Sequence, residues 1–280
     1  MPTVTMIGGG QLARMTHQSA IALGQCLRVL AGSADEPAAQ VSANVVLGSH
    51  DDLEALRAAA EGAVALTFDH EGVPLAHLEA LEADGVQVRP PSKALHFAQD
   101  KMAMRKRLSE LGLPVPAFVD LSGEASAARE ALIEFGESQD WQVVIKAVSG
   151  GYDGRGVWIT DTRDEALAAF DSQVGGDVVL MAEQKIEMAR ELSAMVARSP
   201  YGQGAAWPVV ETVQRKGQCA VVIAPAPGLD PDVAEKAQQM SLTLADELGV
   251  VGAMAMELFE TVDGDLIVNE LAMRPHNSGH

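Results

Sequence analysis

The sequence is poor in basic residues. Its 280 residues include 20 lysines and arginines against 39 aspartates and glutamates, which gives a formal net charge of -19. Nucleic acids and anionic membrane surfaces are polyanions, so this balance argues against both as partners. The plain interpretation is an acidic surface that keeps the protein in solution. An anionic small-molecule substrate is open as a second interpretation if the few basic residues gather in one cleft.

Cysteine, aromatic side chains and long apolar runs are scarce as well. The two cysteines, Cys26 and Cys219, lie far apart and form no metal-binding pattern, so we expect buried, reduced thiols. The N-terminus has no basic segment of the kind that opens a signal peptide, and no apolar run approaches the length of a membrane span. These absences favour a soluble protein of the cytoplasm. Because aromatics make up only 4% of the residues, the cores must be built from aliphatic side chains and methionine.

The first ninety or so residues alternate short apolar strands with helical patterns. Such alternation is typical of a parallel sheet with crossover helices. Strands are expected at residues 4–7, 26–30, 45–47, 63–68 and 86–88, and helices at 11–23, 52–61 and 74–83. The run Arg89-Pro90-Pro91-Ser92 ends this pattern, and we predict a first domain over residues 1–98.

The rest of the chain follows a different order and predicts an α+β domain of two lobes over residues 99–280. A helix is expected over residues 99–111, because Gly112 and Pro114 are typical helix stops. Strands are expected at residues 143–146, 156–160, 178–183, 192–197, 219–224, 250–259 and 266–271, and helices at 162–170 and 231–248. We place one lobe at about residues 115–184 and the other at about 185–280.

A glycine triplet, residues 8–10, joins the first strand to the first helix. Glycine lets the backbone approach an anion, and the start of a helix offers free N–H groups and a positive dipole. We therefore favour a phosphate or phosphoribosyl site. The spacing of Gly8, Gly10 and Ala13 also fits a loose dinucleotide fingerprint, with Asp35 at a suitable distance downstream. A nicotinamide-dependent oxidoreductase and a purely structural turn are the alternatives.

A second glycine-rich loop, residues 150–156, follows Lys146 at the end of an expected strand. Successive N–H groups of such a loop can wrap phosphate oxygens, and the lysine supplies a point charge. It is not a Walker loop, because the lysine precedes the glycines and no helix opens after them. An ordinary hairpin is the alternative, but it leaves Lys146 and the loop's Tyr152, Asp153 and Arg155 unexplained.

Two more stretches carry charge where a nucleotide could bind. The expected strand that ends at Glu183 restarts after a short linker, an arrangement that can hinge two lobes over a purine. A charged surface turn is the alternative. The helix expected from residue 99 is the most basic part of the chain, and its spacing puts Lys101 and Arg105 on one face. A solvated face is the alternative for residues 105–107.

Two carboxylates, Glu257 and Glu270, lie on neighbouring apolar strands near the C-terminal end, and a dense polar run over residues 269–280 follows. Mg²⁺ takes oxygen ligands and usually shares them with substrate phosphates. The pair therefore predicts a divalent cation site and phosphate chemistry.

With these elements in this order, the chain resembles the ATP-grasp ligases and, among them, the 5-(carboxyamino)imidazole ribonucleotide synthases. The motifs that carry the resemblance are Gly8-Gly9-Gly10-Gln11-Leu12, Gln99-Asp100-Lys101, Gly150 to Gly156, Gly252 to Glu257 and Asn269 to His280. It implies an α/β protein with a Rossmann-like, parallel-sheet pre-ATP-grasp domain and a two-lobed α+β ATP-grasp domain. It also implies ATP- and bicarbonate-dependent carboxylation of the exocyclic amine of 5-aminoimidazole ribonucleotide, through carboxyphosphate, in de novo purine synthesis. Another ATP-grasp carboxylate–amine ligase, or a nucleotide-binding fragment without full activity, is the alternative.

The resemblance also implies roles for individual residues. The ATP phosphates would contact Lys101, Lys146 and a lid loop with Gly150, Gly151, Asp153, Gly154 and Gly156. Adenine would lie against Glu183, Gln184 and Ile186, and the ribose would bind Glu191. Mg²⁺, or Mn²⁺, would bind Glu257 and Glu270. The ribonucleotide would face Gly10, Gln11, Leu12 and Glu71, and the carboxyphosphate region would be formed by Tyr152, Arg155, Arg274, His276 and Asn277.

The chain departs from the family pattern in a few places. Met273 stands where proline is more common, Val148-Ser149 replaces a more basic pair, and the neighbours of Glu71 vary. The resemblance implies a small further domain after the closing histidine, which would add basic residues to the ribonucleotide site. That domain is absent from this chain, so we expect Mg-ATP binding with poor turnover. The resemblance further implies a homodimer.

Overall fold

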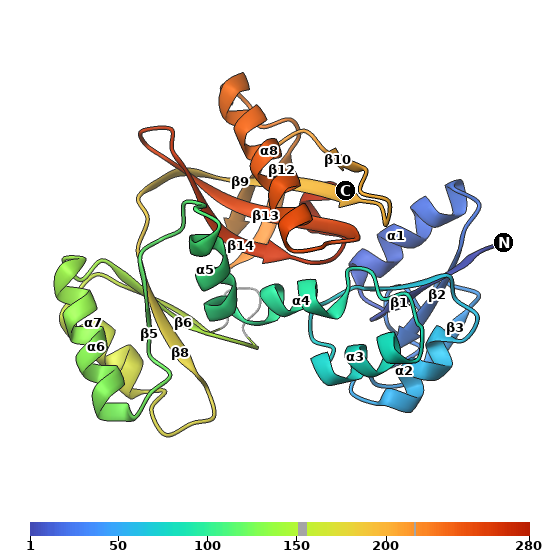
Figure 1. Cartoon of the computed structure of the whole chain (residues 1–280), viewed down its shortest axis with the longest axis horizontal. Helices are drawn as coiled ribbons and strands as arrows, with labels where there is room; N and C mark the ends of the chain where they lie inside the picture. The colour runs from blue at the N-terminus through green and yellow to red at the C-terminus, as the bar shows by residue number, and fades with distance from the viewer. Residues whose placement is uncertain (151–155, 216) are drawn as a thin grey trace.

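The computed structural model describes residues 1–150, 156–215 and 217–280, and Figure 1 shows three sheets along the chain. The first sheet, on the right of the figure, has the strand order β3-β2-β1-β4 and is parallel throughout. Its strands are β1 (Thr3–Ile7), β2 (Cys26–Ala31), β3 (Val45–Leu47) and β4 (Ala65–Phe68), with helices α1 (Gln11–Ala22), α2 (Leu53–Ala60) and α3 (Leu75–Ala83) between or after them. This confirms the parallel-sheet fold expected for the first part of the chain.

The strand expected at residues 86–88 is wrong. Val88 makes only a single parallel bridge with Leu66. Pro90 and Pro91 follow directly, and proline has no N–H group with which to extend a ladder.

The helix expected over residues 99–111 is α5 (Lys101–Glu110), and a further helix that we did not predict, α4 (Ser92–Gln99), precedes it. Asp100 separates them because its backbone is extended and its side chain accepts a hydrogen bond from Ala103 N–H, which starts a new helix. In Figure 1, α4 lies between the first sheet and α5.

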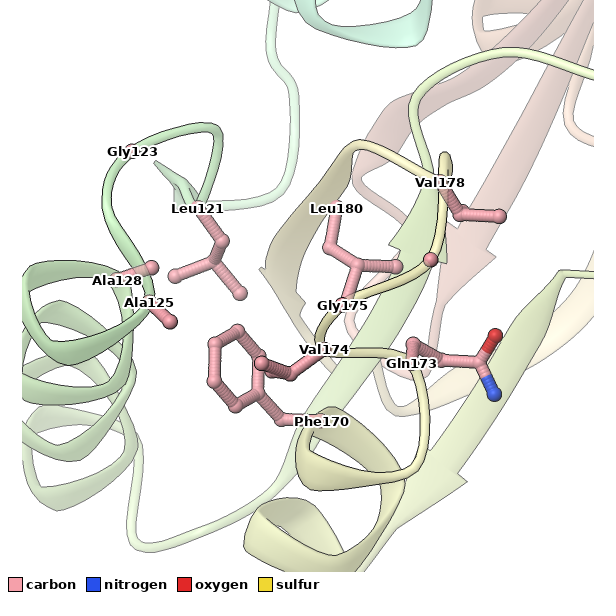
Figure 2. A pocket seen from close by; sticks show the side chains of 11 residues that line it. Leu121, Gly123, Ala125, Ala128, Phe170, Gln173, Val174, Gly175, Val178 and Leu180 are labelled. Carbon is pink, nitrogen blue, oxygen red and sulfur yellow. The ribbon is translucent and has the colours of Figure 1, made fainter.

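The second sheet has the order β5-β8-β6-β7 and is antiparallel. It consists of β5 (Phe118–Asp120), β6 (Val143–Ala147), β7 (Val157–Thr160) and β8 (Leu180–Gln184), and helices α6 (Ala125–Ser138) and α7 (Arg163–Asp171) pack against it. We did not predict β5 or α6 from the sequence. Figure 2 shows a pocket in this lobe that is lined mainly by residues with apolar side chains, where Phe170 lies beside Leu121 and Val174. None of the residues that line this pocket is a predicted site residue.

The third sheet is the largest, with the order β12-β11-β9-β13-β14 and a short β10 beside β9. All its pairings are antiparallel. Its strands are β9 (Met188–Arg198), β10 (Gly204–Ala206), β11 (Val210–Arg215), β12 (Gln218–Ile223), β13 (Gly252–Thr261) and β14 (Leu266–Ala272), with α8 (Pro231–Glu247) against β9 and a 3-10 turn, η1 (Asn277–Gly279), after β14. We did not predict β10 or β11. The two antiparallel sheets confirm the α+β fold expected for the second part of the chain.

One aliphatic core joins the first sheet to the third. Its buried members include Ile7 and Leu66 of the first sheet, Leu95 of α4 and Met256 of β13. Aliphatic and methionine side chains dominate this core, as the scarcity of aromatic residues predicts. In the described part of the chain, no helix combines the length and the apolar character that crossing a membrane requires. Both cysteines are free thiols, but they are half-buried rather than fully buried as expected.

The glycine triplet packs against two carboxylates of the protein itself. Glu36 accepts a hydrogen bond from Gly9 N–H (2.9 Å), and Asp69 accepts from Gly10 N–H (2.6 Å) and Ala13 N–H (2.9 Å). A Cβ atom on Gly10 would lie 2.3 Å from Asp69 Oδ2, so a side chain here would push the Asp69 carboxylate away from the turn. The carboxylates occupy the N–H groups that would hold a phosphate, and an anion at the start of α1 would have to displace Asp69.

We expect Asp69→Ala to lower the free energy of unfolding by about 1–2 kcal/mol, because two N–H groups at the start of α1 lose their acceptor. Urea unfolding of the variant and of an Asp35→Ala control measures the effect. Asp35 is exposed and its hydrogen bonds use its backbone, so its loss should change stability little. Equal stabilities of the two variants would contradict this account of the turn.

Candidate functional site

Glu257 and Glu270 lie directly opposite each other on the paired strands β13 and β14. Like charges in this position repel each other unless cations offset them. Here each carboxylate has its own nitrogen partner. His276 Nε2 lies 3.0 Å from Glu257 Oε1, and the Lys101 ammonium forms an ion pair with Glu270 Oε1. The structure therefore brings together the two carboxylates that the sequence singled out for a metal.

A chain of hydrogen bonds fixes His276 beside Glu257. His276 is buried, and its Nδ1 lies 2.8 Å from Ser278 Oγ, which in turn lies 2.8 Å from Ser193 Oγ on β9. Burial alone would raise the pKa of Glu257, but the hydrogen bond and the charge of His276, with the charges of Arg274 and Lys101, lower it below its usual value. Glu257 is thus held in its ionised form, the form that binds a metal.

A second ion-pair cluster, formed by Glu183, Lys146 and Arg105, lies close to the first. The Glu183 carboxylate of β8 is only 2% exposed, and it accepts from Lys146 Nζ of β6 (2.7 Å) and from Arg105 Nε of α5 (2.6 Å). Burial would raise the pKa of Glu183, yet the two neighbouring cations lower it. Burial also lowers the pKa of Lys146, against the attraction of Glu183. Buried charges persist only when they are paired in this way.

Sequence reasoning missed Arg105 as a member of the site. We allowed residues 105–107 a solvated face, whereas Arg105 is 1% exposed and only Lys106 and Arg107 reach the surface. The helical spacing that puts Lys101 and Arg105 on one face was the signal that could have found it.

Lys101 stands between the two clusters at the start of α5. Its side chain is 11% exposed, and its backbone N–H donates to Val148 O (2.9 Å). Burial, followed by the nearby charges of Lys146 and Arg105, lowers the pKa of Lys101 to about 8. Asn269, next to Glu270, places its Oδ1 3.4 Å from Lys146 Nζ and so connects the clusters on the other side.

The linker predicted to face a purine runs from the end of β8 to β9. The Glu183 side chain is committed to Lys146 and Arg105, so only its backbone is left for the predicted adenine contact. Gln184 is exposed at the end of β8, and Ile186 is half-buried after it. Glu191 of β9 is half-buried, and its pKa is raised by burial and by the charge of Glu257. Glu191 therefore lies on the side of the sheet that carries Glu257.

The predicted substrate residues come from both ends of the chain. Glu71 Oε2 accepts a hydrogen bond from Arg274 Nε (2.7 Å), which ties the first sheet's side of the molecule to the segment after β14. The other oxygen, Oε1, is buried without a hydrogen-bond partner among the described residues. Asn277 is exposed at the start of η1, Leu12 is half-buried on α1, and Gln11 is exposed beside it.

The second glycine loop is described only at its edges. Gly151, Tyr152, Asp153, Gly154 and Arg155 lie outside the described residues. Gly150 adopts a φ of 75°, and Gly156 O accepts a hydrogen bond from Ala147 N–H at the end of β6 (2.8 Å). The loop therefore leaves β6 and enters β7 immediately next to Lys146.

The donor set suits a magnesium ion bound together with a phosphate. Across residues 1–150, 156–215 and 217–280, no group of three His, Cys, Asp or Glu side chains forms a metal cage. Mg²⁺ commonly uses one or two carboxylates and completes its coordination with water and substrate phosphates. Glu257 and Glu270 provide such a pair, and Lys101 and Lys146 lie beside it.

Comparisons with known proteins agree with this arrangement. Residues 1–99 match the family model of the ribonucleotide synthetase preATP-grasp domain, and residues 106–280 match that of the ATP-grasp domain. The whole chain is 58% identical to the N5-carboxyaminoimidazole ribonucleotide synthase of Mycobacterium tuberculosis and spans 64% of that protein's length. It is 49% identical to the Corynebacterium ammoniagenes enzyme of the same name and covers 68% of it.

A solved structure of a protein with the same fold supports the same family. The Aspergillus clavatus N5-carboxyaminoimidazole synthase in complex with ADP and 5-aminoimidazole ribonucleotide superposes with a TM-score of 0.89 at 29% identity, over 100% of this chain and 71% of the other. The chain belongs to the N5-carboxyaminoimidazole ribonucleotide synthase family, within the ATP-grasp proteins.

Proposed function

We propose that this chain binds Mg-ATP and uses it, with bicarbonate, to carboxylate the exocyclic amine of 5-aminoimidazole ribonucleotide. The observation that carries the proposal is the opposed pair Glu257 and Glu270 with two buried lysines beside it. The family supports the reaction, and the Aspergillus clavatus structure contains both ADP and 5-aminoimidazole ribonucleotide. The reaction is phosphoryl transfer to bicarbonate, followed by attack of the amine on carboxyphosphate or on the CO₂ released from it.

The protein's part in the first step is to position charge. Lys101 and Lys146 are each paired with a carboxylate, so both are already oriented and desolvated before a nucleotide arrives. A bound Mg²⁺ would offset the negative charge on the phosphates, and Glu257 and Glu270 are the residues that would hold it. Glu270 would then exchange Lys101 for the metal, which releases the lysine toward a phosphate oxygen.

The second step needs a place for the amine. Glu71 Oε1 is a buried acceptor without a partner among the described residues, and Arg274 holds the other oxygen. We propose that Oε1 accepts a hydrogen bond from the substrate's amine and that Arg274 and His276 face the carboxyphosphate. Tyr152, Arg155 and the glycines of the lid loop keep the roles that the resemblance implies, and closing the loop would exclude water from the labile intermediate. A cytoplasmic location and a homodimer are part of the same proposal and rest on the family.

The experiment is ADP release by the purified chain with bicarbonate, with and without 5-aminoimidazole ribonucleotide. We expect ADP release to increase when the ribonucleotide is added and to be unaffected by other amines. A chain extended by the C-terminal portion of a relative is the comparison for turnover. Stimulation by a different amine would identify another ligase of the ATP-grasp class, and a chain that binds NADH but not ATP would overturn the proposal.

Glu270→Gln should abolish Mg-dependent ATP hydrolysis while the circular dichroism spectrum stays that of the parent. The amide removes one of the two charged metal ligands, but it keeps the shape of the side chain at a partly exposed position. Glu235→Gln on α8 is the control, because that glutamate is exposed and bonds only to the neighbouring Gln239 on its own helix. Unchanged hydrolysis by Glu270→Gln would remove this residue from the metal site.

ATP affinity should fall as the pH rises above about 8, because Lys101 has a pKa of about 8 and loses its positive charge there. Below that pH the lysine is protonated and binds a phosphate oxygen. ATP affinity should fall by up to about tenfold for each pH unit above 8, as long as Lys101 stays protonated in the complex with ATP. Arginine remains charged throughout, so Lys101→Arg should flatten the profile. Calorimetric titration with ATP between pH 7 and pH 10 measures both proteins, and parallel profiles would contradict the role of Lys101.

A further inference from the structure

Arg105 is an arginine with almost no contact with solvent, in a position that no predicted site role covers. It is 1% exposed on α5. Its Nε donates to Glu183 Oε1 (2.6 Å) and its Nη2 donates to the backbone oxygen of Asn269 (2.6 Å). Its Nη1 is buried and has no hydrogen-bond partner among the described residues. The guanidinium is therefore only partly neutralised by the protein.

Both residues that Arg105 contacts also contact the ammonium of Lys146. Glu183 Oε2 lies 2.7 Å from Lys146 Nζ, and Asn269 Oδ1 lies 3.4 Å from the same atom. Glu183 and Lys146 belong to the second sheet, whereas Asn269 belongs to the third and precedes Glu270. Arg105, on α5, therefore contacts Glu183 in the second sheet and Asn269 in the third. Both of these residues also contact the ammonium of Lys146.

The charges of this cluster do not cancel. Within this hydrogen-bonded trio two cations, Arg105 and Lys146, share one carboxylate, Glu183, so one positive charge is in excess, and the other carboxylate that acts on Lys146 is the proposed metal ligand Glu257. Without Arg105, Glu183 and Lys146 would form a neutral buried pair, and the lysine would be held as the carboxylate's only counterion. A neutral pair attracts a phosphate much less than a cluster with a net positive charge does.

We propose that Arg105 is a positioning residue for the nucleotide site: by sharing Glu183 with Lys146, it leaves the lysine's charge available to the phosphates of ATP. The inference rests on the proposed binding of ATP. Fold stability does not explain the residue, since a buried ion pair can often be replaced by apolar side chains of similar volume without loss of stability.

The test measures the dissociation constant for ATP, by calorimetry in the presence of Mg²⁺, on the full chain and four variants. Arg105→Gln removes the charge. Arg105→Gln combined with Glu183→Gln removes the carboxylate as well and so restores the excess positive charge on Lys146. Arg105→Lys keeps the charge with fewer donors. The matched control is Arg198→Gln on β9, because Arg198 also bonds one carboxylate, that of Asp246, and one carbonyl oxygen, that of Val250.

We expect Arg105→Gln to weaken ATP binding about tenfold or more, the effect of losing one charge-assisted interaction. The double variant should return to within about threefold of the parent, and Arg105→Lys and Arg198→Gln should stay within the same range. Rescue of ATP affinity by the second substitution is the expected result, and urea unfolding of the same variants separates it from a structural role, because a structural arginine would change ATP affinity only as far as it changes stability. If Arg105→Gln fails to fold by circular dichroism, the double variant and Arg105→Lys decide the question.

Three outcomes would overturn the proposal. In the first, a folded Arg105→Gln binds ATP as tightly as the parent. In the second, the double variant binds ATP no better than Arg105→Gln. In the third, Arg105→Lys binds ATP more than about tenfold more weakly than the parent. Absence of ATP binding by the parent chain is a separate result, because it would remove the proposed function itself and not only the role of Arg105.

Discussion

The repulsion between Glu257 and Glu270 is the constraint on which the site depends. The register of β13 and β14 places the two carboxylates directly opposite each other, and a pair of like charges in this position destabilises the sheet. The chain supplies His276 to one carboxylate and Lys101 to the other. Before any ligand is present, these partners therefore orient the pair, and the pKa of Glu257 is held below its usual value.

The rest of the architecture delivers those cations from distant segments. Lys101 comes from α5, which follows the first sheet, and Lys146 comes from the second sheet. Arg274 and His276 follow the last strand of the third sheet, and Glu71 reaches Arg274 from beyond β4. A nucleotide bound here would be surrounded by all three sheets. At this junction Arg105 and Lys146 share the carboxylate of Glu183, within a protein whose net charge is -19.

Much of the fold could be predicted from the sequence, because its patterns are local. The alternation of apolar strands with helical segments in the first ninety or so residues needs no knowledge of distant contacts, and only residues 86–88 were given a strand that proline forbids. The strands β5, β10 and β11 and the helices α4 and α6 were missed. β5 and β10 are only three residues long and α6 is rich in alanine, so these segments carry little periodic signal.

The site itself was predictable in its residue types but not in its pairings. The sequence indicated Glu257 and Glu270 by their places on neighbouring apolar strands, and Lys101 and Lys146 by their places at a helix start and a strand end. It gave no means to foresee that Asp69 closes the first glycine turn or that Arg105 shares Glu183, because both contacts join residues more than fifty positions apart. The roles of Tyr152 and Arg155 rest on the family alone, and those of Glu191 and Asn277 rest on the family together with their place near the carboxylates.

The most direct test of the exchange of cations is a crystal structure of the chain with Mg²⁺ and a non-hydrolysable ATP analogue. The account predicts one metal ion bound by Glu257 and Glu270, with Lys101 Nζ moved from Glu270 to a phosphate oxygen and Lys146 still within hydrogen-bond distance of Glu183. A nucleotide bound elsewhere, or a Lys101 that keeps its ion pair with Glu270 while the metal binds other residues, would contradict it.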